Sequence, residues 1–351
     1  MAEELGFAVV GLGMGKHHCR SITEAEGARL VTVCDLDEER LGQMVEKYGC
    51  RSTTRFDDVL ADDEIQVVNI ATPSGMHTEM GTRVADAGKH IIVEKPADIT
   101  PERVDALAEA ANRNGVKVGC IFQSRLEGLN KRIREAIQND ELGKLIGLHG
   151  HLPWFRKQAY YEGPHGDWKG TWGMDGGGSL MNQGVHTVDL IQWLGGPVQQ
   201  VMGMFGVFNH DIEAEDQTMA LLRFENGALG TLYTTTCCYP GLDQQITIYG
   251  SKGSIQKDAS ELLSWKIEGE DEAEVEAEML RRFGKRDKEE GIAADPMAVS
   301  SDGHTLIIED LVQAIREDRD PMIGLESARH AVAIINGIFE SGRTGKAVDL
   351  S

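Results

Sequence analysis

Two segments carry residue types that could perform acid–base chemistry. Lys95 lies between Glu94 and Pro96 at the end of the apolar run His90–Glu94, and Asn182 and His186 follow a run of three glycines. A lysine at the end of a strand can stabilise a developing alkoxide or polarise a carbonyl oxygen. A histidine can accept a proton near neutral pH. The residues alone also allow a surface lysine paired with Glu94, and a buried structural histidine bonded to Asp189.

A glycine-rich turn follows the first apolar run. It contains Gly11, Gly13, Met14 and Gly15, with Lys16 where a G-x-G-x-x-G fingerprint has its third glycine. Such a turn brings the backbone close to a pyrophosphate, and the following helix adds free N–H groups and its positive dipole end.

Asp35 ends the second apolar run, about 20 residues beyond the glycine turn, where a carboxylate can bind both ribose hydroxyls of NAD. The same carboxylate would repel the 2′-phosphate of NADP, and Leu36 supplies no basic replacement. The sequence therefore favours NAD over NADP. The alternative is that Asp35 only begins a loop and caps a helix.

These residues require elements that position them. Over residues 1–125, short β-rich runs alternate with helical stretches such as Asp37–Tyr48 and Pro101–Asn114; the runs are Phe7–Val10, Leu30–Cys34, Arg51–Phe56, Gln66–Ala71, His90–Glu94 and Lys117–Phe122. This alternation predicts a parallel sheet wound on both faces. Ligands bind beyond the carboxyl ends of such strands, and the residues there are Asp35, Thr72, Pro73, Glu94, Lys95 and Gln123.

The pattern changes after about residue 125 to a mainly antiparallel sheet. A helix over Gly128–Asn139 precedes the predicted strands Leu145–Leu152, Val198–Phe208, Gln217–Phe224, Ala228–Thr235 and Gln244–Gly250. A helix over Gly178–Leu194 would place Asn182, His186, Asp189 and Trp193 on one face. We expect a charged surface helix within 266–290 and two closing helices, near 303–317 and 325–341. The predicted domains are 1–125, which binds the nucleotide, and 126–351, which binds the substrate and forms the oligomer.

Composition limits the function classes. The 351 residues fit two domains, and 57 acidic against 35 basic side chains give a net charge of −22. Such a charge disfavours nucleic acid and anionic membranes as partners. With no signal-like start, no membrane-length apolar run and no CxxC pair among six cysteines, we expect a cytoplasmic enzyme with reduced thiols. The spacing of His149, His151, His165 and His210 predicts no metal site.

Four segments resemble the Gfo/Idh/MocA oxidoreductase family, over about residues 5–350. They are AVVGLGMGKHH, ATPSGMHTEMGTRVADAGKHIIVEKP (Ala71–Pro96), DGGGSLMNQGVHTVDLIQWLGG (Asp175–Gly196) and GLESARHAVAIINGIFESGRTGKAV. The resemblance implies an N-terminal Rossmann domain and a C-terminal α/β domain with an open, mainly antiparallel sheet. It also implies hydride transfer between NAD and a secondary hydroxyl of a sugar or cyclitol, for example at ring C3.

The resemblance also implies residue roles. Gly11, Gly13 and Gly15 would hold the pyrophosphate and Asp35 the adenosine ribose; the groove would be lined by Thr72, Pro73 and His77. Glu94 and Lys95 would lie by the nicotinamide, with Pro96 after a cis peptide. His186 would be the general base, and Lys95 would polarise the same substrate oxygen. Many members have an aspartate where this chain has Asn182, which can orient a group but cannot exchange a proton near pH 7.

The substrate and the assembly are the least specified. Arg156, Trp168 and Lys169 lie in an aromatic-rich stretch before the glycine run and are expected to face the substrate; the alternative is that the aromatic residues fill core or a subunit interface. The lack of an obvious basic cluster argues against a nucleotide-linked sugar. The resemblance implies a homodimer or homotetramer formed through the sheet. Two other functions stay open: a non-catalytic NAD-binding sensor, and an enzyme that oxidises a sugar transiently to cleave or epimerise it.

Overall fold

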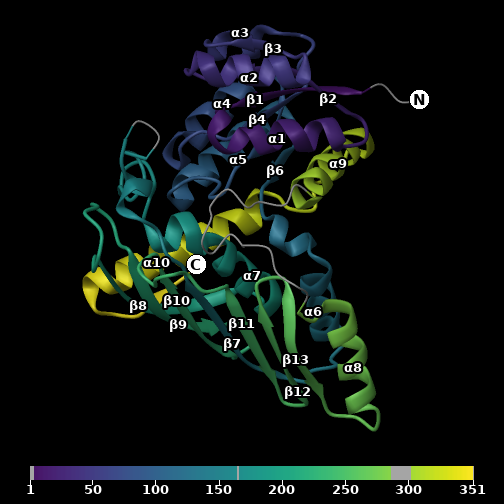
Figure 1. Cartoon of the computed structure of the whole chain (residues 1–351), viewed down its shortest axis with the longest axis vertical. Helices are drawn as coiled ribbons and strands as arrows, with labels where there is room; N and C mark the ends of the chain where they lie inside the picture. The colour runs from purple at the N-terminus through teal and green to yellow at the C-terminus, as the bar shows by residue number, and fades with distance from the viewer. Residues whose placement is uncertain (1–3, 164–165, 286–301, 351) are drawn as a thin grey trace. The chain divides into compact units, whose positions relative to one another are not determined.

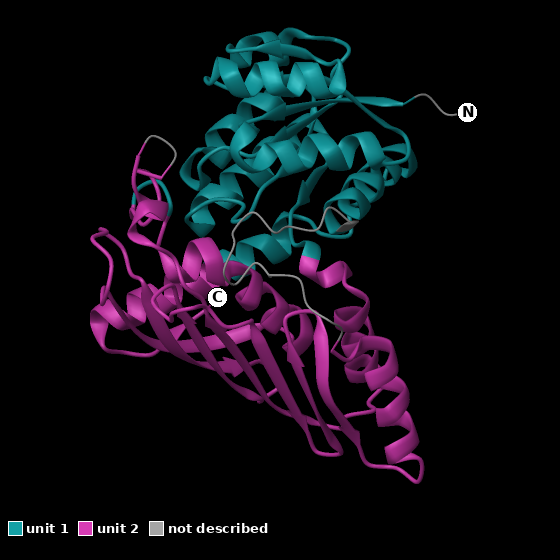
Figure 2. Cartoon of the chain, in the orientation of Figure 1, with its two compact units in different colours: residues 1–123, 173–175, 299–332 teal, residues 124–172, 176–298, 333–351 magenta. Residues whose placement is uncertain are grey.

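The chain forms two compact units. A computed structural model describes residues 4–163, 166–285 and 302–350. Unit 1 comprises Met1–Gln123, Gly173–Asp175 and Val299–Val332; unit 2 comprises Ser124–Trp172, Gly176–Ala298 and Ala333–Ser351 (Figure 2). The sequence placed everything after residue 125 in the second domain. The structure differs because the chain returns to unit 1 near its C-terminal end, and a linear pattern does not reveal such a return.

Unit 1 contains a six-stranded parallel sheet in the order β3-β2-β1-β4-β5-β6 (Figure 1). Its strands are β1 (Leu5–Val10), β2 (Ala28–Cys34), β3 (Arg51–Thr53), β4 (Val67–Ile70), β5 (His90–Val93) and β6 (Val118–Cys120). The order reverses direction at β1, which is the topology of the Rossmann fold. The central strands are buried on both faces, which explains their nearly continuous apolar sequence.

Unit 1 also contains helical segments, most of which connect these strands. They are α1 (Leu12–Glu24), α2 (Glu38–Tyr48), α3 (Phe56–Ala61), η1 (Ser74–Met76), α4 (His77–Asp86), α5 (Pro101–Asn114) and the returning α9 (Asp302–Glu317). Asp37 caps α2 by accepting the N–H groups of Glu39 and Arg40. Gly49 and Gly115 end α2 and α5 at φ +67° and +66°, a left-handed conformation that favours glycine.

Unit 2 contains an eight-stranded sheet in the order β13-β12-β11-β7-β10-β9-β8-β14. The strands are β7 (Leu145–Pro153), β8 (Val198–Gly206), β9 (Gln217–Phe224), β10 (Leu229–Thr235), β11 (Gln245–Gly250), β12 (Gly253–Asp258), β13 (Glu261–Ile267) and β14 (Val348–Asp349). All neighbours pair antiparallel except β10 and β7, which are parallel. The sheet is therefore mainly antiparallel, as predicted.

The helical segments of unit 2 are η2 (Gln123–Leu126), α6 (Gly128–Gln138), η3 (Gln158–Tyr161), η4 (Ser179–Gly184), α7 (Val185–Gly195), α8 (Glu272–Phe283) and the end of α10 (Leu325–Thr344). The first residue of η2, Gln123, belongs to unit 1. Helix α7 packs closely on β7: a Cβ at Gly150 would lie 2.5 Å from Ile191 Cδ1. The charged segment 266–290 contains the last residues of β13 and the exposed helix α8, while 286–290 lie outside the described residues.

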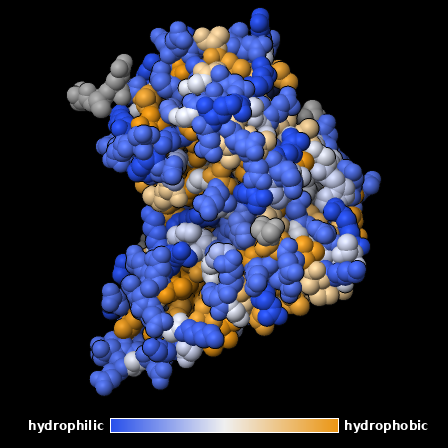
Figure 3. Space-filling model, turned by 180° about the vertical axis from the view of Figure 1, so that it is seen from behind, coloured by the Kyte–Doolittle hydropathy of each residue, from blue (hydrophilic) through white to orange (hydrophobic). Residues whose placement is uncertain are grey.

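One face of the unit 2 sheet carries exposed apolar side chains. Met202 pairs with Leu221 across β8 and β9, and Met204 pairs with Met219. These four side chains are 43–76% exposed, whereas their alternating neighbours Val201 and Leu222 are buried. Figure 3 shows apolar residues gathered at several places among hydrophilic ones on one side of the molecule. Within the described part of the chain, no helix is long and apolar enough to cross a membrane.

Candidate functional site

The glycine turn after β1 is closely packed at Gly11 and Gly15 and open at Gly13. Gly11 has φ +87°, and a Cβ there would lie 2.6 Å from the carbonyl oxygen of Ala71. Gly13 faces open space, and a Cβ on Gly15 would lie 2.8 Å from Val9 Cγ1. Gly15 therefore provides the close helix–strand packing of the third fingerprint glycine, one residue early. This explains how Lys16 is tolerated at the fingerprint position.

Asp35 lies beside this turn at the end of β2. Its Oδ2 accepts the N–H of Leu12 at 2.5 Å, and its Oδ1 accepts the N–H of Asp37 at 2.9 Å. Asp37 caps α2, whereas Asp35 holds the N–H of Leu12, the first residue of α1. The sequence analysis missed Arg40, whose Nη1 lies 4.0 Å from Asp35 Oδ2.

The next strand ends offer buried polar atoms. Among the described residues, Thr72 Oγ1 and Gln123 Oε1 are buried and have no hydrogen-bond partner. Buried polar atoms normally have a partner, so these two atoms fit a site that binds a polar ligand such as a dinucleotide. His77 spans two loops: its ring nitrogens lie 2.9 Å from the carbonyl oxygen of Thr72 and 2.8 Å from that of Pro96. The ring links the loops after β4 and β5.

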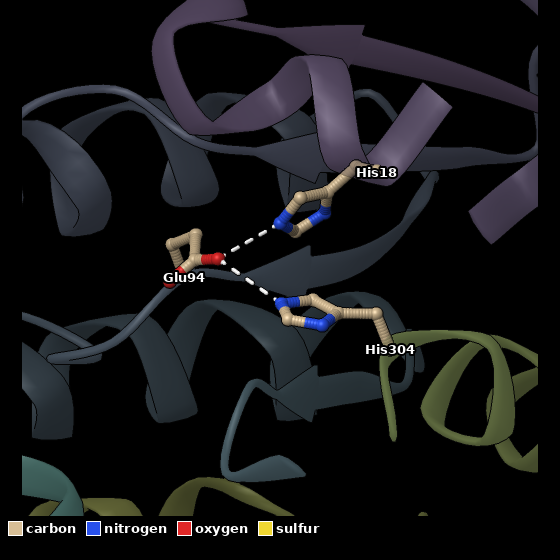
Figure 4. A group of neighbouring side chains, drawn as sticks. All are labelled: His18, Glu94 and His304. Carbon is tan, nitrogen blue, oxygen red and sulfur yellow. Dashed lines mark hydrogen bonds and ion pairs between the residues drawn. The ribbon is translucent and has the colours of Figure 1, made fainter. Parts of the chain in front are cut away.

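Glu94 is buried between two imidazoles (Figure 4). Its Oε1 accepts a hydrogen bond from His18 Nε2 at 2.8 Å and lies 3.7 Å from His304 Nε2, which α9 supplies. Burial opposes ionisation of Glu94, but the His18 hydrogen bond and the nearby His304 hold its pKa well below the usual value. Burial lowers the pKa of His18. A neutral His18 can thus donate from Nε2 while its Nδ1 accepts from Asn69 at 3.1 Å.

The other oxygen of Glu94 fixes the backbone of Lys95. Glu94 Oε2 accepts the Lys95 N–H at 2.9 Å. The Lys95–Pro96 peptide is cis, as the resemblance implied, and the Lys95 side chain is half-buried. The Glu94 carboxylate, which His18 and His304 flank, therefore orients the backbone of Lys95 at the end of β5.

Among the residues that the structure describes, two groups of side chains bring potential metal ligands within 4.8 Å of one another: His18, Glu94 and His304, and His210, Asp216 and Cys237. The sequence did not predict either group, because each combines distant segments. In the first, the 2.8 Å contact is a hydrogen-bond distance. In the second, both carboxylate oxygens of Asp216 already accept backbone N–H groups. His165, which was considered with the other histidines, lies outside the described residues.

In unit 2, Asn182 and His186 lie on consecutive helical segments. Asn182 belongs to the π-helical turn η4 and is 9% exposed, while His186 is in the first turn of α7 and half-buried. The sequence predicted one regular helix. π-helical turns use i→i+5 hydrogen bonds and often occur at functional sites, and here the wider turn changes the angular spacing between Asn182 and His186.

Asp189 forms an ion pair with Arg125, which the sequence analysis did not consider. The Arg125 Nε donates to Asp189 Oδ2 at 2.8 Å, and its Nη2 bonds the other oxygen. Both side chains are buried, and burial raises the pKa of Asp189 despite the arginine. The guanidinium of Arg125 thus engages both oxygens of Asp189, and Gln192 Nε2 also donates to Oδ1 at 3.3 Å.

The expected substrate residues form a polar network with Asn182. Arg156 is 3% exposed and its Nη2 donates to Gln183 Oε1 at 3.2 Å. Gln183 Nε2 donates to Asn182 Oδ1 at 2.6 Å and to Tyr160 Oη at 2.8 Å. Neither Gln183 nor Tyr160 was predicted from the sequence as a substrate residue. Both residues connect Arg156 to Asn182.

The other two expected substrate residues lie near the same tyrosine. The Lys169 ammonium is 3.8 Å from the centre of the Tyr160 ring and 6.0 Å from that of Trp168. The first is a cation–π contact, which holds the ammonium over the aromatic face.

Family models match both parts of the chain. Residues 5–122 match the oxidoreductase family with an NAD-binding Rossmann fold, and residues 130–256 match the Gfo/Idh/MocA C-terminal domain. The chain belongs to the Gfo/Idh/MocA oxidoreductase family. The resemblance seen in the sequence is thus confirmed.

Several relatives within this family have named activities. Myo-inositol 2-dehydrogenase of Thermotoga maritima is 26% identical over 261 residues, covering 71% of this chain and 74% of the relative. The NAD⁺-dependent scyllo-inositol 2-dehydrogenase of Bacillus subtilis is 27% identical over 266 residues, covering 73% and 74%. The WlbA dehydrogenase of Bordetella pertussis, solved with NADH and UDP-GlcNAcA, is 29% identical with a TM-score of 0.86 and covers 100% of this chain and 99% of that one.

Proposed function

We propose that this oxidoreductase transfers a hydride between NAD and a secondary hydroxyl of a sugar or cyclitol. The observation that carries the proposal is the rim of the unit 1 sheet, where Asp35, Thr72, Glu94, Lys95 and Gln123 follow the carboxyl ends of four parallel strands, β2, β4, β5 and β6. This rim is where α/β sheets of this topology bind ligands. The named inositol dehydrogenases support the reaction class.

NAD fits the groups along this rim. Gly11, Gly13, Met14 and Gly15 would lie against the pyrophosphate, and Asp35 would bind the adenosine ribose. Thr72 and Gln123 supply buried polar atoms, and Pro73 and His77 shape the groove between their loops. Bound NAD would accept the hydride from the substrate carbon.

Lys95 and His186 divide the proton chemistry. Lys95 would donate a hydrogen bond to the substrate oxygen and stabilise negative charge on it as the proton leaves. His186 would accept that proton, and Asn182 would hydrogen-bond the substrate without exchanging a proton. The proposal requires Lys95 and His186 to reach the same hydroxyl in the working enzyme.

A substrate panel tests this function. The purified protein should bind NAD⁺ and form NADH with at least one member of a panel that includes myo-inositol, scyllo-inositol, UDP-GlcNAcA, neutral sugars and sugar acids. We expect Arg156, Trp168 and Lys169 to contribute to the specificity. NAD binding without NADH formation on any substrate would favour a sensor, and epimerised or cleaved product without net NADH would indicate transient oxidation.

The exposed face of the unit 2 sheet supports a homo-oligomer. Contiguous exposed apolar patches commonly mark protein–protein interfaces, and Met202, Met204, Met219 and Leu221 form one across two paired strands. We propose that a second copy of the chain covers this face.

Negative charges on the exposed face of the unit 2 sheet should dissociate the proposed oligomer into monomers. Met219→Glu with Leu221→Glu would place unpaired carboxylates in the interface, where burial is costly. Light scattering after size exclusion should give the monomer mass for this variant and a dimer or tetramer for the wild type. Val275→Glu, at an exposed position of α8, is the control. A monomeric wild type would refute the proposed assembly.

A further inference from the structure

Glu215 and Asp216 are adjacent acids that the proposed chemistry does not use. They end the loop between β8 and β9, and both side chains are 0% exposed. An uncompensated buried carboxylate is costly. The groups that bind each carboxylate therefore indicate what the carboxylate does.

Glu215 binds the start of the helical segment that carries Asn182 and His186. Its Oε2 accepts the Gly178 N–H at 2.5 Å, and its Oε1 accepts the Leu180 N–H at 2.6 Å. The backbone oxygen of Glu215 accepts the Ser179 N–H at 2.9 Å. Three consecutive N–H groups at the beginning of η4 are thus held by one residue from a distant part of the chain.

The contact between Glu215 and Gly178 is close, and the N–H groups at the start of η4 favour a carboxylate there. A Cβ at Gly178 would lie 2.0 Å from the Glu215 carbonyl oxygen, so only glycine permits this approach. First-turn N–H groups lack partners within their own helix, and the positive end of the helix dipole favours a carboxylate there. Burial raises the pKa of Glu215 to about 7, although the Leu180 and Gly178 N–H bonds act in the opposite direction.

Asp216 binds the loop before it. Its Oδ1 accepts the Phe208 N–H at 2.8 Å, and its Oδ2 accepts the N–H groups of Asn209 and His210 at 2.9 and 3.0 Å. Burial opposes ionisation, but the hydrogen bonds from Asn209 and Phe208, with those from Cys237 and His210, lower the pKa of Asp216.

His210 extends this contact to Arg156. His210 Nδ1 lies 3.0 Å from Asp216 Oδ2, and Nε2 lies 2.8 Å from the backbone oxygen of Arg156. Both distances are within hydrogen-bonding range. The Arg156 N–H donates in turn to the Thr236 carbonyl at 2.8 Å. Asp216 thus fixes the backbone of Arg156 through one imidazole.

We propose that Glu215 and Asp216 are positioning residues with separate tasks: Glu215 places the helical segment of Asn182 and His186, and Asp216 places Arg156 through His210. The inference rests on the proposed function for the roles of His186 and Arg156. It predicts that a substitution of Glu215 mainly lowers kcat, because the base His186 is misplaced. A substitution of Asp216 should mainly raise KM, because the substrate-binding side chain of Arg156 is misplaced.

Glu215→Gln tests the first task. The amide keeps the size of the side chain but directs an NH₂ group at one of the helical N–H groups, so one hydrogen bond is lost. We expect kcat to fall by up to about 10²-fold, the cost of a small misplacement of a reacting group, with little change in KM. Glu215→Asp retains both acceptor oxygens on a shorter side chain and provides the same comparison if Glu215→Gln does not fold.

Asp216→Asn tests the second task. The amide replaces one carboxylate oxygen with an NH₂ group, so at least one hydrogen bond from Phe208, Asn209 or His210 is lost and the Arg156 loop should loosen. We expect KM for the substrate to rise about tenfold or more, with kcat changed less. Glu127→Gln is the control, because Glu127 is a half-buried acid of the same unit whose carboxylate lies 3.9 Å from Lys257 Nζ. This variant should retain both constants.

Amide hydrogen exchange separates this inference from the proposed function. Glu215→Gln should speed exchange in residues 178–190, and Asp216→Asn in residues 154–160, whether or not a substrate is known. If the wild type turns over no substrate, the proposed function fails while exchange still tests the positioning. Equal kinetic effects of the two variants, or exchange rates unchanged in both segments, would overturn the inference.

Discussion

Replacing Lys95 with methionine should lower kcat by about 10²–10³-fold, because loss of one donor to a developing oxyanion costs about that much. His186→Asn should lower kcat by about 10²–10⁴-fold, the usual contribution of a general base. NADH formation with the best substrate of the panel provides the measurement. Both variants should still bind NAD⁺, since neither changes the glycine turn or Asp35.

The double variant tests whether the two residues act together. Residues that act as a unit have strongly non-additive effects, so Lys95→Met with His186→Asn should lose much less than the product of the single losses. Lys47→Met, an exposed lysine of α2, is the control and should keep wild-type kcat. Losses that multiply fully would argue that Lys95 and His186 act on different steps.

Replacing Asp35 with serine should reverse the cofactor preference. A carboxylate beside the 2′-phosphate of NADP costs several kcal/mol, and each 1.4 kcal/mol corresponds to a factor of ten. Serine removes this repulsion and also releases Arg40, whose Nη1 lies 4.0 Å from Asp35, to bind the phosphate. We expect the ratio of kcat/KM for NAD to that for NADP to fall by about 10²-fold or more.

Two companion variants identify the cause. Asp35→Ser with Arg40→Ala should lose most of the gained NADP activity, because the cation is gone. Asp37→Asn changes the cap of α2 and leaves Asp35 in place, so this variant should still prefer NAD over NADP. A wild type that prefers NADP would contradict the role given to Asp35.

The sequence predicted the elements that rest on local pattern. The strands of unit 1 are continuous apolar runs ended by polar residues, and the glycines after α2 and α5 mark true helix ends. For the same reason the rim residues could be named before the fold was known. Periodicity also gave the helix over 178–194, although not its π-helical turn.

The sequence could not predict contacts between distant segments. His304 returns to Glu94 from a helix near the C-terminal end, and Arg125 reaches Asp189 across 64 residues. Strand β12 was missed because Lys257 is buried there and breaks the apolar alternation; its ammonium bonds Asn130 Oδ1 at 2.8 Å. The sequence did not indicate that Glu215 and Asp216 are buried, because the residue type alone does not distinguish a buried acid from an exposed one.

A structure of the ternary complex tests the central claim most directly. Crystals of the wild type with NADH and the substrate found in the panel should place Lys95 Nζ and a ring nitrogen of His186 within about 3.2 Å of one substrate oxygen, the reach of a hydrogen bond. The carbon bearing that oxygen should face the nicotinamide. A complex in which either side chain lies beyond about 4 Å from that oxygen would contradict the shared proton chemistry proposed for the two residues.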